Sequence, residues 1–292
     1  MRRLGWRAEA AALDVFAAAV GRTGPRARLA LGSAFGTVFW GVDARHRRAA
    51  QRNIALAYGG QLSTREVNRL ALASMRHFAR VLVETAAFGH YRPDETLRLV
   101  RADGIEHLRN AQARGHGLLG FSGHFGHWEL VRLVAAQQGL PSLAVARPLD
   151  NPYLNRRVNR LREAGGNGVI AKRGGVAAAL QYLREGRFVT MMVDQRSEHS
   201  GVAVPFFGHQ AFAAGSLAAL ALRSGAPIVP GFAFLEPDKS WHAVIGPEVP
   251  VVRTGDLRAD ARRIMTDCSA VLEQWVRRYP EQWLWTHARL KA

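Results

Sequence analysis

Apolar runs of strand length alternate with amphipathic segments along the last two thirds of the chain. The runs occupy residues 117–121, 142–146, 188–193, 228–234 and 241–245. Helical spacing of apolar residues is found between and after them, at residues 130–138, 152–163, 175–184, 217–223 and 257–279. Strands that are buried on both faces are nearly continuous apolar runs, and helices connect them when they are parallel. The pattern therefore predicts an α/β fold with a largely parallel central sheet flanked by helices.

The first ninety residues have a different pattern, which is helical throughout. Residues 43–58 are expected to form one helix. The sequence Ser63-Thr64-Arg65-Glu66 is typical of a capping box, which would begin a second helix that extends to about residue 88. The chain is therefore expected to start with a helical region ahead of the alternating strands and helices.

An apolar run of 14 residues lies at positions 29–42. A helix that crosses a bilayer needs about 20 apolar residues, so this run is too short to span one. A cleaved secretory signal is not expected either, because Glu9 and Asp14 interrupt the apolar stretch that precedes the run.

Three aromatic residues near this run, Trp6, Phe39 and Trp40, are of the kind found at membrane interfaces. They favour a helix that lies on a membrane or is partly inserted in it. The alternative is an ordinary helical subdomain with a solvated basic face. We divide the chain into an N-terminal membrane-associating helical segment, residues 1–42, and a second domain, residues 43–292.

The charge of the chain is strongly positive. It has 40 Lys or Arg and 23 Asp or Glu among 292 residues, a formal charge of +17. Nucleic acid, an anionic membrane and an acidic substrate all suit such a charge. Ten Arg and three acidic residues lie in the first 60 positions, and a polybasic cluster beside an amphipathic segment is typical of anionic lipid binding. Of the 40 basic residues 37 are Arg, which suits phosphate groups but also follows from a GC-rich genome.

The composition excludes several classes of protein. Hydrophobic residues make up 48% of the chain, which is enough for a core and excludes a disordered protein. The single cysteine, Cys268, excludes an intrachain disulfide and a Cys-rich zinc site.

Residues 121–130, with the sequence FSGHFGHWEL, contain the densest set of reactive side chains. The segment follows a predicted buried strand and begins a helix, and ligands bind at such strand ends in open α/β sheets. Gly123 and Gly126 permit a tight turn that would present His124 and bring Glu129 back against its imidazole. A neutral imidazole can take a proton from an attacking hydroxyl group, and a carboxylate on its other nitrogen fixes the tautomer. The alternative is a loop histidine followed by an acid at a helix N-terminus.

A metal site is a second alternative for this segment, because His127 lies between His124 and Glu129. The spacing of zinc proteases, two histidines four apart around a glutamate, is missing. The cysteine pair of zinc deaminases is also missing. We therefore expect no metal.

The segment resembles the motif of glycerolipid acyltransferases, a histidine and an acid separated by four residues. Its Gly-His-Phe-Gly-x-Trp-Glu sequence is similar to that of the bacterial late lipid A acyltransferases and their relatives that acylate mycobacterial phosphatidylinositol mannosides. That branch usually has Asn in place of His127. Further blocks similar to the family follow in order at residues 51–54, 147–152, 194–208 and 280–289.

The resemblance implies transfer of an acyl chain from an acyl carrier protein or coenzyme A thioester to a hydroxyl group of a lipid A precursor, another glycolipid or a lysolipid. It implies an acyltransferase domain at residues 43–292 that acts at the cytoplasmic face of the bacterial inner membrane, with no cofactor. His124 would be the general base and Glu129 its partner.

The resemblance also implies the residues that bind substrate. Arg147 and Arg162 would bind phosphate, although each is also explained as a solvated or loop-capping arginine. Asp194 follows a buried strand, where it would organise the site or a turn. Phe206 and Phe207, beside Gly208, would line an acyl channel, or they pack in the core. The expected substrate-binding residues are Arg147, Arg162, Asp194, Gln195, Phe206, Phe207 and Gly208.

Two other classes of function remain open from the sequence. A basic nucleic-acid-binding protein is supported by the charge alone, since the sequence has no nucleic-acid-binding motif, and we expect no nucleic-acid partner. A soluble thioester or ester hydrolase is the other alternative, although the chain lacks the Gly-x-Ser-x-Gly motif.

Overall fold

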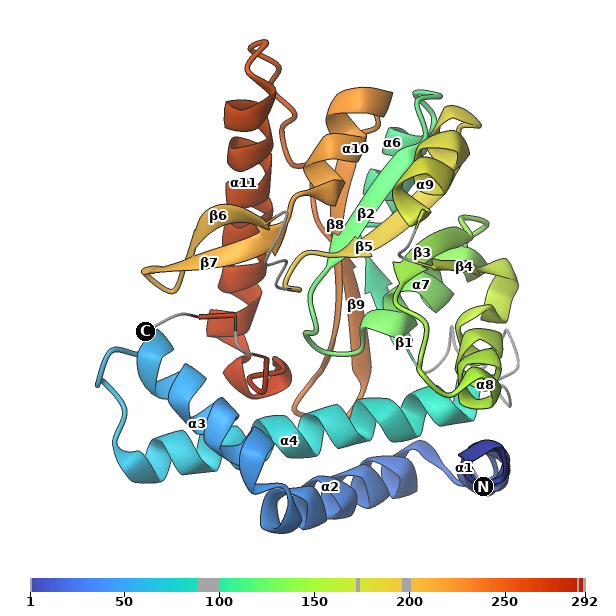
Figure 1. Ribbon diagram of the computed structural model, residues 1–292, viewed down its shortest axis with the longest axis vertical. Coiled ribbons are helices and arrows are strands. Elements are labelled where there is room, and N and C mark those ends of the chain that lie inside the picture. The colour runs from blue at the N-terminus through green and yellow to red at the C-terminus, as the bar shows by residue number, and fades with distance from the viewer. Residues whose placement is uncertain (1, 89–99, 172–173, 196–200, 288, 291–292) are drawn as a thin grey trace.

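A seven-stranded sheet forms the centre of the molecule. The computed structural model describes residues 2–88, 100–171, 174–195, 201–287 and 289–290 (Figure 1). The strand order is β1-β9-β8-β2-β5-β3-β4. Within the described residues the pairing of β8 with β9 is antiparallel and the other pairings in this sheet are parallel. The bounds are β1 (Val100–Asp103), β2 (Leu118–Ser122), β3 (Ser142–Ala146), β4 (Gly168–Ala171), β5 (Phe188–Met192), β8 (Ile228–Leu235) and β9 (Trp241–Ile245). The mixed α/β fold predicted from the sequence is confirmed.

Helices cover both faces of the sheet. On one face α6 (Ile105–Gln112) and α7 (Trp128–Gln137) pack against the strands through a small apolar cluster that includes Leu108 and Ala135. On the other face lie α9 (Gly175–Arg184), α10 (Ser216–Ser224) and α11 (Leu257–Arg278), which share the main core (Figure 1). The remaining helix of this part, α8 (Pro152–Arg162), contacts β4 at the edge of the sheet.

The four N-terminal helices form a separate layer below the sheet in Figure 1. They are α1 (Arg2–Gly21), α2 (Pro25–Val42), α3 (Ala44–Ala57) and α4 (Thr64–Ala87). The predicted capping box is confirmed, since Ser63 and Glu66 bond each other reciprocally at the start of α4. A Cβ at Gly32 or Gly36 of α2 would lie 2.4 Å from a Cα atom of α4, so the two glycines allow these helices to pack closely.

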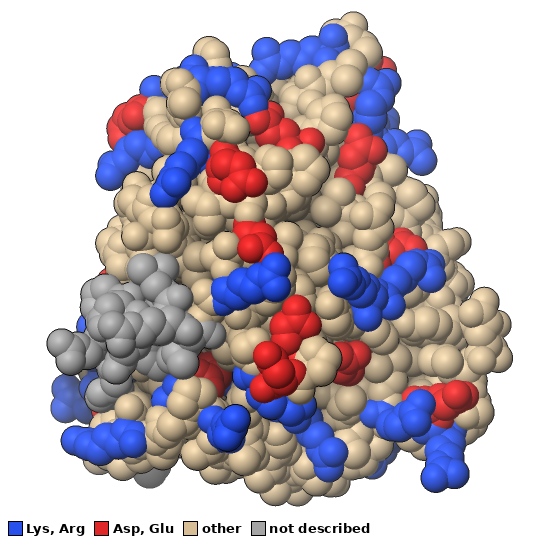
Figure 2. Space-filling view, turned by 180° about the vertical axis from the view of Figure 1, so that it is seen from behind, with Lys and Arg blue, Asp and Glu red and all other residues tan. Residues whose placement is uncertain are grey.

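The helices of this layer are less hydrophobic than a helix that spans a membrane. Among the helices of the described residues, none combines the length and the hydropathy that a bilayer crossing requires. Seen from behind, Lys and Arg side chains follow the lower border of the molecule, where α1 to α4 lie, with acidic side chains among them (Figure 2).

Several elements were not predicted from the sequence. Two are the strands β1 and β4, which are only four residues long, and a third is α6. The others are β6 (Gly201–Phe206) and β7 (His209–Ala214), an antiparallel hairpin that packs against α11. Short 3₁₀ turns occur at Ala164–Gly166 and Pro280–Gln282. The strands β1 and β4 are too short to show a clear alternation of apolar and polar residues. The hairpin of β6 and β7 lies outside the alternation of strands and helices from which the fold was predicted.

Candidate active site

The loop that carries His124 joins β2, in the middle of the sheet, to α7. It lies at the carboxyl end of a central strand, the place where open α/β sheets bind ligands. Gly126 has a φ of +56°, and a Cβ there would lie 1.7 Å from the carbonyl oxygen of Ala233, so the turn requires glycine. At Gly123 the requirement is space, because a Cβ would lie 3.0 Å from a carboxylate oxygen of Asp194.

Asp194 lies beside His124 because of the register of the sheet. Ser122 of β2 is paired with Met192 of β5, and two further residues along each parallel strand lead to His124 and Asp194. Asp194 Oδ1 is 2.8 Å from His124 Nδ1, and Oδ2 accepts the backbone N–H of His124 at 2.6 Å. Trp283 donates its indole N–H to the same Oδ2 at 3.0 Å. With Nδ1 bonded to the carboxylate, Nε2 is the ring nitrogen left for a substrate.

The two groups shift each other's pKa. Burial by itself lowers the pKa of His124, but the charge of Asp194 and its hydrogen bond outweigh burial and raise this pKa above its usual value. Burial by itself raises the pKa of Asp194, but the charge of His124 and its hydrogen bond outweigh burial and hold this pKa well below its usual range. Asp194 is therefore ionised, and His124 is a base only above its raised pKa.

Glu129 lines the same cavity as His124, and its charge contributes to the raised pKa of His124, but its hydrogen bonds go to two arginines. Its carboxylate accepts hydrogen bonds from Arg162 Nε at 2.6 Å and from Arg132 Nη1 at 3.3 Å. Arg132 is one turn further along α7 and is buried, and Arg162 is the last residue of α8. Glu129 is thus bound by two arginines on the side of α7 that faces α8, and the carboxylate that accepts the hydrogen bond of His124 Nδ1 is that of Asp194.

An apolar cavity of about 200 Å³ begins at His124 and extends between the sheet and the helices α6 and α7. Its deeper wall comes from Leu108, Val131 and Ala135 of the helices and from strand residues that include Phe121, Phe188, Val229 and Ile245. At Gly231 of β8 a Cβ would lie 2.8 Å from a methyl group of Val131, so larger residues would narrow the cavity there.

Most of the predicted site residues meet at the mouth of this cavity. Arg147, Arg162 and Gln195 line it together with His124 and Glu129. Arg147 is exposed and 3.4 Å from Asp150, whereas a quarter of the Arg162 side chain is exposed. The mouth therefore presents two guanidinium groups beside the imidazole, an arrangement suited to an anionic ligand.

Phe206, Phe207 and Gly208 lie elsewhere and are not part of the cavity wall. Phe207 and Gly208 both have positive φ, +51° and +74°, and form the turn between β6 and β7. Phe206 is fully buried, and the guanidinium of Arg289 lies 4.0 Å from the centre of its ring. The core alternative therefore describes these aromatic residues better than an acyl channel does.

The C-terminal segment packs against the loop that carries His124. The backbone N–H of Leu284 donates to the carbonyl oxygen of His124 at 3.0 Å, and the ring of His287 lies 5.0 Å from that of His124. Asn53 of α3 donates its side-chain amide to the carbonyl oxygens of Trp285 and His287 at 2.6 and 2.7 Å. The blocks at residues 51–54 and 280–289 therefore meet next to His124.

His127 is packed in the interior rather than aimed at a ligand. Its ring stacks on that of Phe88 at 5.1 Å and meets the edge of Trp241 at 5.1 Å. Burial lowers the pKa of His127 to about 3, and the pKa of the neighbouring buried His77 to about 3 as well. Within the described ranges no group of three or more His, Cys, Asp or Glu side chains is arranged to hold a metal ion.

Several supporting residues were not identified from the sequence. Trp283 is not among the predicted site residues, yet its indole N–H donates to Asp194. Arg132 and Asn53 had no assigned role, yet they bind Glu129 and the C-terminal segment. The polar groups of these three side chains are buried and hydrogen-bonded. In the sequence, the one sign of a buried polar side chain is that its neighbours are apolar.

The chain was compared with known protein families. The family described as bacterial lipid A biosynthesis acyltransferase matches residues 10–292. This match covers the loop that carries His124, the arginines at the cavity mouth and the C-terminal segment.

Individual relatives agree with this match. The lipid A biosynthesis lauroyltransferase of Escherichia coli is 27% identical over 268 residues, which are 90% of this chain and 84% of that protein. The lipid A biosynthesis palmitoleoyltransferase of the same organism is 25% identical over 90% of this chain and 84% of its own length. The phosphatidylinositol mannoside acyltransferase of Mycolicibacterium smegmatis is 28% identical over 74% of this chain and 69% of its own length.

Proposed function

The chain belongs to the bacterial lipid A biosynthesis acyltransferase family and is a lipid acyltransferase, and we propose that it is an O-acyltransferase acting on a glycolipid. The donor is a fatty acyl thioester of acyl carrier protein or coenzyme A. The acceptor is a hydroxyl group of a lipid A precursor or of a related glycolipid or lysolipid. The observation that carries this proposal is the His124–Asp194 pair at the mouth of an apolar cavity beside two arginines.

The proposed reaction has two steps. His124 Nε2 takes the proton of the acceptor hydroxyl group while its oxygen attacks the thioester carbonyl carbon, and a C–O bond forms. The C–S bond of the tetrahedral intermediate then breaks, and the leaving sulfur takes the proton back from the imidazolium. Asp194 keeps Nδ1 protonated and stabilises the imidazolium in between, as the carboxylate does in a serine hydrolase triad.

Glu129 acts in this mechanism through Arg162. The amide groups of His124, Gly126 and His127 already donate to protein oxygens, so they do not provide an oxyanion hole. Arg162 uses Nε for Glu129, which leaves its terminal nitrogens for an anionic ligand at the cavity mouth. We assign Arg162 to the thioester oxyanion or a donor phosphate, with Arg147 and Gln195 beside it.

The acyl chain of the donor lies in the apolar cavity between the sheet and the helices α6 and α7. The strand and helix side chains of the wall exclude water from the chain, and the thioester carbon remains at the mouth near His124. The distance from the cavity mouth to the wall at Leu108 and Ile245 then limits the length of the acyl chain that the cavity can hold.

The segment of residues 1–42 associates with the membrane through an exposed apolar face. Phe35, Val38, Phe39 and Val42 are 39–74% exposed and recur at the spacing of one helix face on α2. Arginine side chains border this layer, which suits an anionic surface such as the cytoplasmic face of the bacterial inner membrane (Figure 2).

The test is acyl transfer by the purified full chain. Lauroyl thioester of acyl carrier protein or coenzyme A is mixed with a lipid A precursor or a lysolipid, and free thiol and acylated lipid are both measured. We expect thiol release that depends on the acceptor and is lost in His124→Ala. Undiminished transfer by His124→Ala would contradict the mechanism, and thiol release without any acylated lipid would favour the hydrolase alternative.

A further inference from the structure

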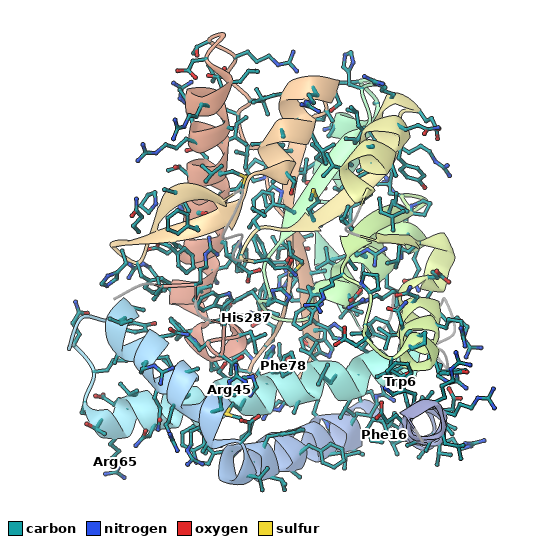
Figure 3. All side chains as sticks on the ribbon, in the orientation of Figure 1. Trp6, Phe16, Arg45, Arg65, Phe78 and His287 are labelled. Carbon is teal, nitrogen blue, oxygen red and sulfur yellow. The ribbon has the colours of Figure 1, made fainter. Side chains whose placement is uncertain are left out.

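A second apolar cavity of about 320 Å³ lies close to His124, since His287 in its lining has its ring 5.0 Å from that of His124. It is formed between the N-terminal helices and the C-terminal segment (Figure 3). Met75, Phe78, Ala79 and Leu82 of α4 form one wall, and Leu284, Thr286 and His287 form another. Phe39, Asp43 and His46 complete it near the junction of α2 and α3.

Two ring pairs separate this second cavity from the first. His287 lines the second cavity and lies 5.0 Å from His124, which lines the first. Phe78 lines the second cavity and stacks at 6.2 Å on Trp128, which lines the first. The two spaces therefore approach each other at the imidazole of His124.

The other end of the second cavity opens on the exposed apolar face of α2. Phe39 and Leu82, at its mouth, are 51% and 47% exposed. Val38 and Val42 continue the same apolar surface along α2 outside the cavity. An apolar molecule that leaves a bilayer beneath this face would meet Phe39 and Leu82 at the mouth, with the Asp43–His46 pair at one side of the cavity.

The two cavities differ in charge, and this difference distinguishes their ligands. Arg132, Arg147 and Arg162 line the first, whereas the lining of the second, within the described residues, includes no Lys or Arg. A donor with phosphate groups therefore fits the first cavity. The second has apolar walls, polar groups from His46, Thr286 and His287, and one acidic side chain, Asp43, which bonds His46. An acid disfavours a phosphate group, so this cavity fits a hydrocarbon chain with an uncharged hydroxylated group.

We propose that the second cavity holds one apolar chain of the lipid acceptor and presents its hydroxyl group to His124. This inference rests on the proposed acyl transfer and adds to it the route of the acceptor. Donor and acceptor chains then occupy separate cavities whose linings meet near His124, and the acceptor enters from the membrane face.

The test is photolabelling of the full chain with an alkyl glucoside that has a twelve-carbon chain and a diazirine at its end. Mass spectrometry of the digested protein identifies the labelled residues. We expect labels at Met75, Phe78 or Leu82. Labels confined to the first cavity, or to the exposed surface of α2, would overturn the proposal.

Two variants with a matched control sharpen the test. Leu82→Trp and Phe39→Trp fill the mouth from α4 and from α2, and we expect each to reduce labelling of Met75 and Phe78 at least fivefold. Val252→Trp adds the same ring at an exposed position that lines neither cavity and should leave labelling unchanged. Equal labelling in all three variants would overturn the proposal. Because Leu82 and Phe39 are half exposed, both variants are expected to fold, and an unchanged Tm checks this.

Acyl transfer by the same proteins separates this inference from the proposed function. For Leu82→Trp we expect at least a fivefold higher KM for a long-chain acceptor, with an unchanged KM for the thioester. An unchanged KM for the acceptor would overturn the cavity assignment and leave acyl transfer standing. Absence of transfer by the unmodified chain, with every acceptor, would instead remove the proposed function.

Discussion

The carboxylate of Asp194 lies 2.8 Å from Nδ1 of His124, and it reaches this place from a strand that is 70 residues away in sequence. Glu129, five residues from His124, binds Arg162 at 2.6 Å instead. The two acids thus have different partners, and their substitution should have different consequences.

Substitution of Asp194 should change both the rate and its pH dependence. In Asp194→Asn we expect kcat to fall by about 10²–10⁴, since an amide neither fixes the tautomer nor stabilises the imidazolium. Asp194 raises the pKa of His124, and the neutral base exists above that pKa, so activity falls as pH decreases through it. Removal of the charge should move this acid limb to lower pH. The measurement is kcat/KM against pH, and an unmoved limb would contradict the assigned pair.

Substitutions of Glu129 and Arg162 should have effects that are not additive. Arg162→Gln removes the guanidinium group that faces the ligand. Glu129→Gln removes the carboxylate that holds Arg162 in place. We expect each to lower kcat/KM by about 10–100-fold, and the double variant to be little worse than the worse single one. Additive losses would show that Glu129 acts independently of Arg162. Tm must be measured in parallel, because removal of the acid leaves the buried Arg132 without this ion pair, at a cost of about 3–5 kcal/mol.

The wall of the first cavity should set the acyl chain length. Leu108→Ala removes bulk from the wall, whereas Ala135→Leu adds bulk from α7. We expect the preferred donor to lengthen in the first variant and to shorten in the second. Competition between thioesters of ten to sixteen carbons in one reaction reports the preference as a ratio, which a loss of stability does not alter. A shift of both variants in the same direction would argue against this cavity as the acyl site.

The two buried histidines should make the protein sensitive to acid. Burial lowers the pKa of His77 and of His127 to about 3, whereas the unfolded chain has the ordinary value of about 6.5. The unfolded state then binds more protons between these values, so stability falls as pH decreases below about 6.5. Each histidine should contribute a loss of about 2 kcal/mol between pH 7.5 and 5.

Urea unfolding of His127→Asn at these two pH values tests this expectation. The loss of stability on acidification should be smaller than in the unmodified chain by about the contribution of one histidine. His116→Asn, at an exposed position, is the matched control and should keep the full loss. An equal loss in His127→Asn would mean that other groups dominate the acid response.

The exposed face of α2 should bind anionic vesicles. In Val38→Glu we expect co-sedimentation with vesicles that contain phosphatidylglycerol to decrease several-fold, because a charge replaces an exposed apolar residue on the proposed membrane face. Val252→Glu changes an exposed valine in the catalytic part of the chain and should have no effect. Equal binding by both variants would assign membrane contact to another surface.

Much of the fold follows from local patterns in the sequence. The strand β9 begins and ends at the predicted residues, and the capping box of Ser63 and Glu66 begins α4 as expected. Apolar runs and helix caps depend on neighbouring residues, so a single sequence contains them. The short strands β1 and β4 and the β6–β7 hairpin were missed because they depend on pairing with distant segments.

The sequence by itself also determined where two of the proposed site residues would lie. It placed His124 and Asp194 after buried strands, and parallel strands present such residues at one edge of the sheet. It did not determine which acid would meet the imidazole. That choice depends on β5 lying next to β2 with Ser122 opposite Met192, and on a C-terminal segment that returns with Trp283 to hold Asp194. Hydrogen bonds form between groups that are near in space, and only the packed structure brings residues 124, 194 and 283 together.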